Sequence, residues 1–239
     1  MKLDVLALGA HPDDVELSCG GTVAKLAKQG RRVGIADLTR GELGTRGSRE
    51  IRAAEAAEAA RLLGVQVREN LGIPDGNLET SLENRLKIVQ IIRKYQPDVL
   101  LFPYPVDRHP DHERAHTLCR EAWFAAGLEK VETTLEGRVQ EPFRPRAYYH
   151  FMQWFEFKPS FIIDITDEFD QRMQCVGAFK SQFYDPDSNE RQTILSTPEF
   201  IEMLRTRLAY YGDKIGKKYG EPFYSVSPIN VPDLFALNL

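Results

Sequence analysis

Two short segments of the chain gather side chains that bind metal ions and move protons. Residues 9–14 read Gly-Ala-His-Pro-Asp-Asp and follow an apolar run near the N-terminus. Residues 107–112 read Asp-Arg-His-Pro-Asp-His and follow a second apolar run, residues 99–103. Imidazole and carboxylate groups are ligands that zinc takes in catalytic sites. We therefore expect the two segments to build one metal centre.

Each candidate residue, taken alone, has a simpler explanation. His11 is compatible with a buried structural histidine, and an aspartate just after it with a cap on the following helix. The density of the set in two strand-end segments favours a metal site instead. Three protein ligands with a fourth position open to water form the arrangement that metal-assisted hydrolysis requires. The candidate ligands and proton carriers are His11, Asp13, Asp14, His109, Asp111 and His112.

Two other histidines are interpreted as lying outside the metal site. His116 follows one turn further along the same predicted helix, where three ligands are already available, so we expect a supporting or solvent-facing residue. His150 has no partner in the sequence and is interpreted as structural.

The apolar pattern predicts the elements that must position these clusters. Strand-like runs alternate with amphipathic helical runs, which is typical of βαβ units around a mostly parallel sheet. We expect a Rossmann-like three-layer α/β sandwich that forms a single domain over residues 1–239. Ligands of such sheets bind outside the carboxyl ends of the strands, where both clusters lie. The predicted strands are residues 3–8, 32–38, 65–70, 99–102, 148–155, 161–165 and 224–226, and the predicted helices are residues 16–29, 48–63, 81–95, a segment from about 111, 167–183 and 198–211.

Other site types are not supported by the sequence. The turn after the first strand lacks the G-x-G-x-x-G pattern of a dinucleotide site, and its two carboxylates would repel a phosphate. Gly20 and Gly21 are interpreted instead as allowing close packing of the first helix. No G-x-S-x-G segment is present, so acyl-enzyme chemistry on a serine is not indicated. Residues 128–146 are polar and are predicted to form a loop.

Composition limits the partners. The net charge of −4 argues against nucleic acid and against anionic membranes, and a small molecule is the expected ligand. No signal-peptide pattern and no membrane-spanning run is present. Three widely spaced cysteines, Cys19, Cys119 and Cys175, are interpreted as reduced buried thiols, so we expect a cytoplasmic protein.

Arginines gather near both clusters. Residues 39–52 are rich in glycine and arginine, and Arg108 adjoins the second cluster. Because a guanidinium binds a carboxylate through two hydrogen bonds, this pattern indicates an anion-binding role. The alternative for any one of these arginines is a solvated helix start capped by Ser48.

On the segments Ala-His-Pro-Asp-Asp (10–14) and His-Pro-Asp-His (109–112), the sequence resembles the LmbE-like, or PIG-L, family of zinc-dependent N-deacetylases. Residues 158–161 and 180–183 extend the resemblance over most of the chain. Residues 37–47 and 103–112 look most like the bacillithiol-biosynthesis branch, which deacetylates N-acetylglucosaminyl-malate.

The resemblance implies one zinc ion per chain, bound by His11, Asp14 and His112, with Asp13 as the general base. This division is chemically reasonable, since zinc lowers the pKa of a bound water to about 7 and a neighbouring carboxylate can take its proton. The N and O ligands also accept iron, cobalt and nickel.

The resemblance implies further roles around the ion. A protonated His109 would stabilise the oxyanion, and Asp111 would orient His109. Arg52 and Arg108 match positions that bind the anionic group attached to the sugar. Relatives are associated with a mobile tyrosine from the C-terminal half, which is left unassigned here; Tyr184 is the residue considered for it. A homo-oligomer is also implied.

The expected function is zinc-dependent hydrolysis of the N-acetyl group of N-acetylglucosaminyl-malate to glucosaminyl-malate and acetate, in bacillithiol biosynthesis. One alternative is a deacetylase of the same family acting on N-acetylglucosamine, a chito-oligosaccharide or an inositol conjugate. Another is a non-catalytic metal- or sugar-binding module, although Asp13 would not be needed merely to hold zinc. A phosphoesterase is disfavoured because ligands for only one ion are visible.

Overall fold

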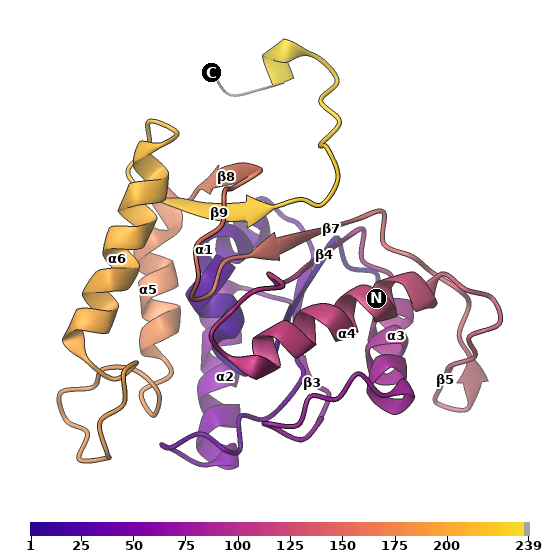
Figure 1. Cartoon of the computed structure of the whole chain (residues 1–239), viewed down its shortest axis with the longest axis horizontal. Helices are drawn as coiled ribbons and strands as arrows, with labels where there is room; N and C mark the ends of the chain where they lie inside the picture. Colours follow the sequence, from indigo (N-terminus) through magenta and orange to yellow (C-terminus); the bar gives the residue numbers. More distant parts are fainter. Residues whose placement is uncertain (237–239) are drawn as a thin grey trace.

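A seven-stranded sheet runs through the centre of the protein (Figure 1). The computed structural model describes residues 1–236. The strand order is β3-β2-β1-β4-β7-β9-β8; the first five strands are parallel, and β9 runs antiparallel to both of its neighbours. The mostly parallel sheet predicted from the sequence is therefore confirmed. The strands are β1 (Val5–Gly9), β2 (Val33–Asp37), β3 (Val67–Asn70), β4 (Val99–Pro103), β7 (Ala147–Phe151), β8 (Phe161–Asp164) and β9 (Gly220–Tyr224).

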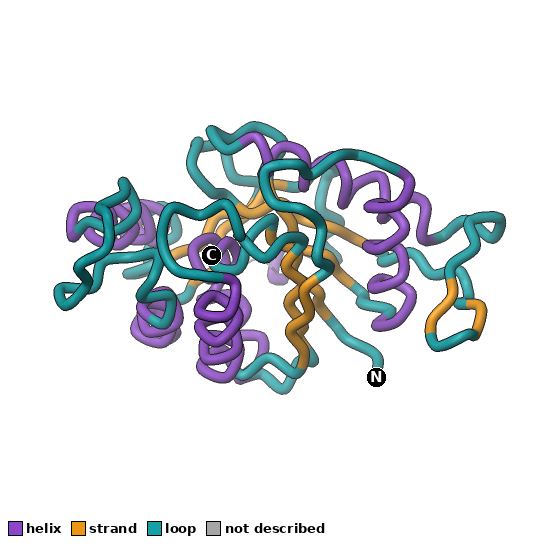
Figure 2. Tube along the Cα trace, turned by 90° about the horizontal axis from the view of Figure 1, so that it is seen from below, coloured by secondary structure: helices purple, strands orange, loops and turns teal. Residues whose placement is uncertain are grey.

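Helices cover both faces of this sheet, as the expected three-layer sandwich requires (Figure 2). Helices α1, α2 and α5 pack together on one face, α3 and α4 pack on the other, and α6 lies against β9 and β8. No helix among residues 1–236 is long and apolar enough to cross a bilayer. The helices are α1 (Asp14–Lys28), α2 (Arg49–Leu63), α3 (Leu82–Tyr95), α4 (Pro110–Ala126), α5 (Phe169–Gly177) and α6 (Pro198–Asp213), with short 3₁₀ turns at Thr166–Glu168 and Leu234–Ala236.

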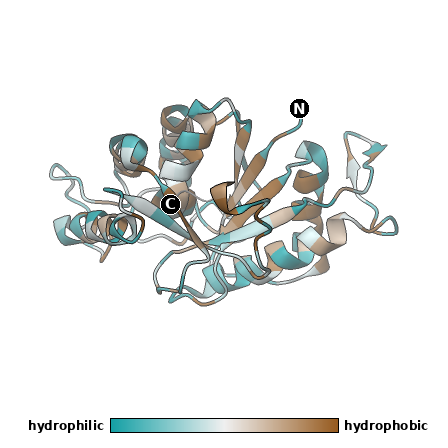
Figure 3. Cartoon of the chain, turned by 90° about the horizontal axis from the view of Figure 1, so that it is seen from above, coloured by the Kyte–Doolittle hydropathy of each residue, from teal (hydrophilic) through white to brown (hydrophobic). Residues whose placement is uncertain are grey.

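The alternation of side chains along β1 builds two cores at once. Leu6 and Leu8 pack into the cluster under α3 and α4, while Val5 and Ala7 pack into the cluster under α1 and α5. Successive residues of a strand point to opposite faces, so a strand covered on both sides must be apolar throughout. Figure 3 shows the hydrophobic colour concentrated on these central strands.

The sequence of connections creates a crevice at one edge of the sheet. The chain proceeds from β1 outward to β2 and β3, then returns to place β4 on the other side of β1. The loops that follow β1 and β4 therefore leave in opposite directions, and ligands bind at such switch points of parallel sheets. Both ligand-rich segments of the sequence lie here.

Four predicted elements differ from the structure. The strand predicted at 148–155 ends at Phe151, because residues 152–155 bend toward the site. The helix predicted at 167–183 ends at Gly177, after which Phe179 and Phe183 turn into a separate apolar cluster. The last strand is Gly220–Tyr224 rather than 224–226, and its register is set by pairing with β7 and β8.

The polar segment 128–146 is the fourth, since it contains a small antiparallel hairpin instead of only loop. It is formed by β5 (Thr134–Leu135) and β6 (Arg138–Val139), joined through Glu136 and Gly137 at positive φ. Buried Arg93 fixes the chain just before this hairpin by donating to the carbonyls of Ala126, Leu128 and Val131. Two-residue strands have too little periodicity for the sequence to reveal them.

Candidate metal centre and active-site pocket

The loop after β1 folds tightly back on itself. A Cβ on Gly9 would lie 3.0 Å from Cβ of Asp14, so only glycine fits this turn without displacement. The backbone N–H of His11 donates to Oδ2 of Asp14 at 2.9 Å. Asp13 has φ of 125°, a conformation that non-glycine residues rarely adopt and that is often found at functional sites. The turn thus holds three polar side chains in fixed directions.

Two of these side chains meet His112 from the start of α4. The donor atoms of His11, Asp14 and His112 all lie within 4.8 Å of one another. His112 Nε2 is 3.3 Å from Asp14 Oδ1, and His11 Nδ1 is 3.6 Å from Asp14 Oδ2. Tetrahedral zinc with bonds of about 2.1 Å places its ligand atoms roughly 3.4 Å apart. The three predicted ligands therefore fit a zinc ion in both donor type and spacing.

Two further aspartates orient the histidines from behind. His112 Nδ1 is 2.8 Å from Oδ1 of Asp107, and His11 Nε2 is 3.0 Å from Oδ1 of Asp75. Such outer carboxylates fix which ring nitrogen carries the proton and leave the other free for a metal. Sequence reasoning missed both roles. Asp107 opens the second ligand-rich segment, whereas Asp75 lies in a Pro-Asp-Gly turn that gave no functional signal.

The charges of the site favour a cation. Burial works against a charged ring, yet Asp14 and Asp107 raise the pKa of His112 to about 9. The pKa of His11 is likewise raised, against its burial, by Asp111, Asp14 and Asp75. A site that strengthens proton binding on two imidazoles also stabilises a divalent cation that displaces those protons.

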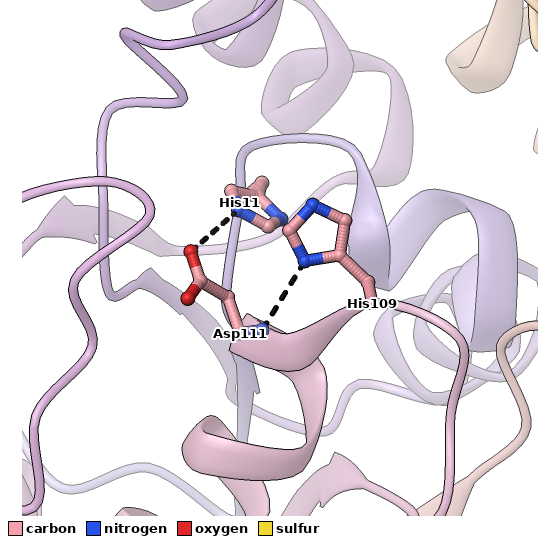
Figure 4. A group of neighbouring side chains, drawn as sticks. All are labelled: His11, His109 and Asp111. Carbon is pink, nitrogen blue, oxygen red and sulfur yellow. Dashed lines mark hydrogen bonds and ion pairs between the residues drawn. The ribbon is translucent and has the colours of Figure 1, made fainter.

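His109 and Asp111 form a second group of possible metal ligands with His11 (Figure 4). This group and the first one, His11, Asp14 and His112, are called the two donor groups below. The backbone N–H of Asp111 donates to His109 Nδ1 at 3.2 Å, so His109 caps the N-terminus of α4. The Asp111 carboxylate instead lies 3.5 Å from His11 Nε2 and accepts from the Gly76 N–H at 2.8 Å. The predicted orientation of His109 by Asp111 thus runs through the backbone, not through the carboxylate.

The expected protonation of His109 differs from what its surroundings favour. Burial, together with the neighbouring His11 and His112, lowers the pKa of His109. Because Nδ1 accepts a hydrogen bond, the proton of the neutral ring resides on Nε2. His109 is therefore a neutral donor at neutral pH.

Asp13 is paired with Arg52 and is not in either donor group. Arg52 Nη2 donates to Asp13 Oδ2 at 2.9 Å and to the carbonyl of Pro12. Burial raises the pKa of Asp13 to about 7, against the effect of Arg52 and with a contribution from Asp14. Arg52 does line the pocket, but its guanidinium is buried and engaged with Asp13 rather than free for a substrate anion.

A cavity of about 450 Å³ opens beside these groups. Part of its lining, called here the apolar wall, is formed by Trp154, Ile194, Phe200 and Leu204. Predicted Arg108 is exposed at the mouth, with its guanidinium carbon 4.1 Å from the centre of the Trp154 ring. No tyrosine of the described chain lines this cavity, and Tyr184 lies outside it.

The residues interpreted as structural lie away from the metal-facing groups. His116 and His150 each place Nδ1 3.1 Å from the carbonyl of Pro103, and neither belongs to a donor group. All three cysteines are free and buried, as predicted. A Cβ on Gly21 would lie 2.8 Å from Ile165, which confirms the close packing expected of this helix.

Comparisons with known proteins agree with this geometry. A sequence model of the PIG-L family, described as GlcNAc-PI de-N-acetylase, matches residues 6–123. The chain is 32% identical to diacetylchitobiose deacetylase of Thermococcus kodakarensis over 91% of its own length and 80% of the relative. It is 26% identical to the probable N-acetyl-alpha-D-glucosaminyl L-malate deacetylase 2 of Bacillus cereus, over 76% of this chain and 84% of the relative. The similarity to the malate-conjugate enzyme is therefore the weaker of the two.

Solved structures show the same architecture. The conserved protein TT1542 from Thermus thermophilus is 42% identical, with a TM-score of 0.85 over 96% of this chain and 98% of that one. The 4-carboxy-2-hydroxymuconate hydratase of Pseudomonas putida shares the fold at 22% identity, with a TM-score of 0.77 over 98% of this chain and 100% of that one. Because that neighbour is named for another reaction, fold alone does not identify the chemistry.

Proposed function

We propose a reaction for this protein from the premise that it belongs to the PIG-L family of de-N-acetylases. It hydrolyses the N-acetyl group of an N-acetylglucosamine conjugate, releasing acetate and the free amine. The observation that carries the proposal is the convergence of His11, Asp14 and His112 beside Asp13, a buried carboxylate that belongs to neither donor group. A site that only stored a metal would not need that carboxylate.

A zinc ion held by His11, Asp14 and His112 would polarise the amide carbonyl and acidify a water molecule. Asp13 takes the proton of the attacking water, since a general base works best with a pKa near the working pH. Arg52 holds the Asp13 carboxylate in place through its 2.9 Å contact. Asp13 then returns that proton to the leaving nitrogen, the C–N bond breaks, and the amine departs uncharged; the acetic acid left behind releases its own proton to water and becomes acetate.

His109 has a separate task in this proposal. Its Nδ1 is occupied by the Asp111 N–H, so Nε2–H is the group able to donate. Such a donor stabilises the negative charge that develops on the carbonyl oxygen. A neutral donor does this without needing a protonated ring, which the surroundings of His109 disfavour.

The group attached to the sugar has two candidates. A second sugar is favoured by the similarity to diacetylchitobiose deacetylase and by the aromatic wall formed by Trp154 and Phe200. Malate is favoured by the arginines that line the cavity, including Arg108 and Arg207. The expected homo-oligomer, single-domain organisation and cytoplasmic location stay predictions.

Metal analysis of the purified protein, coupled to acetate release, tests this function. The substrates are N-acetylglucosaminyl-malate, diacetylchitobiose and free N-acetylglucosamine. We expect one divalent ion per chain and acetate from at least one conjugate, with activity lost on chelation and regained with zinc. A fully loaded protein that releases no acetate from any of them would support the non-catalytic module instead.

A further inference from the structure

One face of α6 forms part of the pocket wall. Phe200, Leu204 and Arg207 follow at spacings of four and three residues, which places them on one side of a helix, and all three line the cavity. Phe200 and Leu204 are buried apolar residues. Arg207 therefore brings a cation into a wall that is otherwise apolar.

Arg207 has few partners for a charged group in this position. Its Nη1 donates to the backbone carbonyl of Gln153, and no carboxylate within residues 1–236 forms an ion pair with it. Burial, with a contribution from nearby Arg172, lowers the pKa of Arg207 to about 10 against a weaker opposite effect of Glu156 and Asp107, so the guanidinium is still protonated at neutral pH. A partly desolvated cation with no carboxylate in direct contact is costly, and an anion bound directly to the guanidinium would offset that cost.

The other arginines of the pocket differ in this respect. Arg52 is paired with Asp13, and Arg46 is paired with Glu190 and also donates to Ser188. Arg108 is exposed, and its charge is already solvated. Among the arginines lining the described pocket, Arg207 is thus the one that is both withdrawn from solvent and unmatched by a carboxylate.

Arg207 is also close to the metal-binding residues. Gln153, whose carbonyl accepts from Arg207, places its side-chain Nε2 3.3 Å from His112 Nε2. The next residue, Trp154, donates its N–H to Oδ2 of Asp107 at 2.7 Å, which fixes this stretch of backbone. A ligand held by Arg207 therefore lies in the same cavity as the proposed reaction.

We propose that Arg207 binds a carboxylate inside the pocket. A planar guanidinium recognises a carboxylate through two parallel hydrogen bonds, and one that keeps free N–H groups is suited to that geometry. The carboxylate has two possible sources, the group attached to the sugar or the acetate product. The choice of source rests on the proposed function, whereas carboxylate binding by itself does not.

Calorimetric titration of the metal-loaded protein with L-malate and with acetate, at constant ionic strength, tests the binding step. We expect Arg207→Gln to weaken binding of at least one of them about tenfold or more. Arg205→Gln is the matched control, because Arg205 is on the same helix but is exposed and outside the pocket. Equal affinities in wild type, Arg207→Gln and Arg205→Gln would overturn the proposal.

Kinetics then separate the two sources. A tenfold fall of kcat/KM for the malate conjugate relative to diacetylchitobiose in Arg207→Gln assigns the carboxylate to the substrate. A tenfold rise in the acetate inhibition constant, with that ratio unchanged, assigns it to the product. If wild type releases no acetate from any substrate, the proposed function fails while the titration still decides the role of Arg207.

A further variant guards against misfolding. Arg207→Lys keeps the charge but offers a single ammonium in place of the planar fork. If Arg207→Gln does not fold, we expect Arg207→Lys to weaken carboxylate binding threefold or more while the melting temperature stays within a few degrees of wild type. Unchanged affinity in that variant would contradict the proposal.

Discussion

The two sides of the pocket are built in different ways. The metal-facing side comes from two loops that follow adjacent parallel strands, β1 and β4, and nearly every side chain there is charged or an imidazole. The other side, the apolar wall, comes from α6, the segment around Ile194 and the bend after β7, which meets the metal-facing residues at Gln153. In the proposed function, the metal-facing side carries out the reaction, and the apolar wall selects the substrate. Similar chemistry can therefore be kept while the substrate changes.

The largest effect is expected on the metal-facing side. Replacing Asp13 with Asn keeps the size of the side chain but removes the base, so acetate release should fall about a thousandfold, within the range usual for general acid–base catalysis. Metal content should stay at the wild-type level, because Asp13 belongs to neither donor group. Steady-state kinetics and metal analysis of the same preparation measure both. Near-normal turnover would show that Asp13 is not the general base and that the metal-facing side does not act as described.

A smaller effect on the same side is expected from the residues behind the ligands. Asp107→Asn weakens the acceptor that orients His112 through the 2.8 Å contact, so metal affinity should fall about 10- to 100-fold. Competition with a chelator of known affinity measures this. Asp37→Asn is a useful control, because Asp37 is a buried aspartate whose partner is Arg68 on the neighbouring strand. If both variants bind metal equally well, Asp107 does not orient His112 for metal binding.

Sequence reasoning succeeded on one side of this comparison and largely failed on the other. The strands β1, β2 and β4 were predicted within one or two residues, because buried parallel strands are continuous apolar runs. The metal-facing residues are contiguous in sequence and follow those strands directly. The apolar wall has no such signal in the sequence. The α6 helix was predicted, but its apolar period alone does not tell which face meets a cavity.

The functional residues that the sequence did not reveal were missed for one physical reason. Asp75, Gln153 and Arg207 act through partners that are 64, 41 and 54 residues away in the chain. Their functional surroundings exist only after the sheet has brought distant loops to one edge. Arg52 is a different case: its residue type indicated an anion site, which stays a prediction, and the fold adds Asp13 as a partner that the sequence did not reveal.

A third prediction concerns His150 in β7, whose Nδ1 lies 3.1 Å from the carbonyl of Pro103 at the end of β4. These two strands lead into the two sides of the pocket. Burial lowers the pKa of His150 to about 4, below the ordinary value of 6.5. As the pH falls below 6.5, His150 binds a proton in the unfolded chain but stays neutral in the folded protein until about pH 4. The free energy of unfolding is therefore unaffected by this group above pH 6.5 and falls by about 2 kcal/mol between pH 7 and pH 5. His150→Asn should remove this part of the pH dependence. Urea unfolding at both pH values measures it, and an identical pH dependence in the variant would contradict the assignment.

The smallest effect is expected on the apolar wall, and it sharpens the comparison most directly. Trp154→Ala removes an aromatic surface from the apolar wall, together with the ring that contacts Arg108, whose guanidinium carbon lies 4.1 Å from the ring centre. We expect the Trp154 ring to bind the substrate equally in the ground and transition states, so KM should rise about five- to tenfold while kcat is preserved. Trp123→Ala is the matched control, since Trp123 lies outside the cavity. A large fall in kcat with unchanged KM would mean that the apolar wall takes part in the chemistry, and the two sides could no longer be treated as separate.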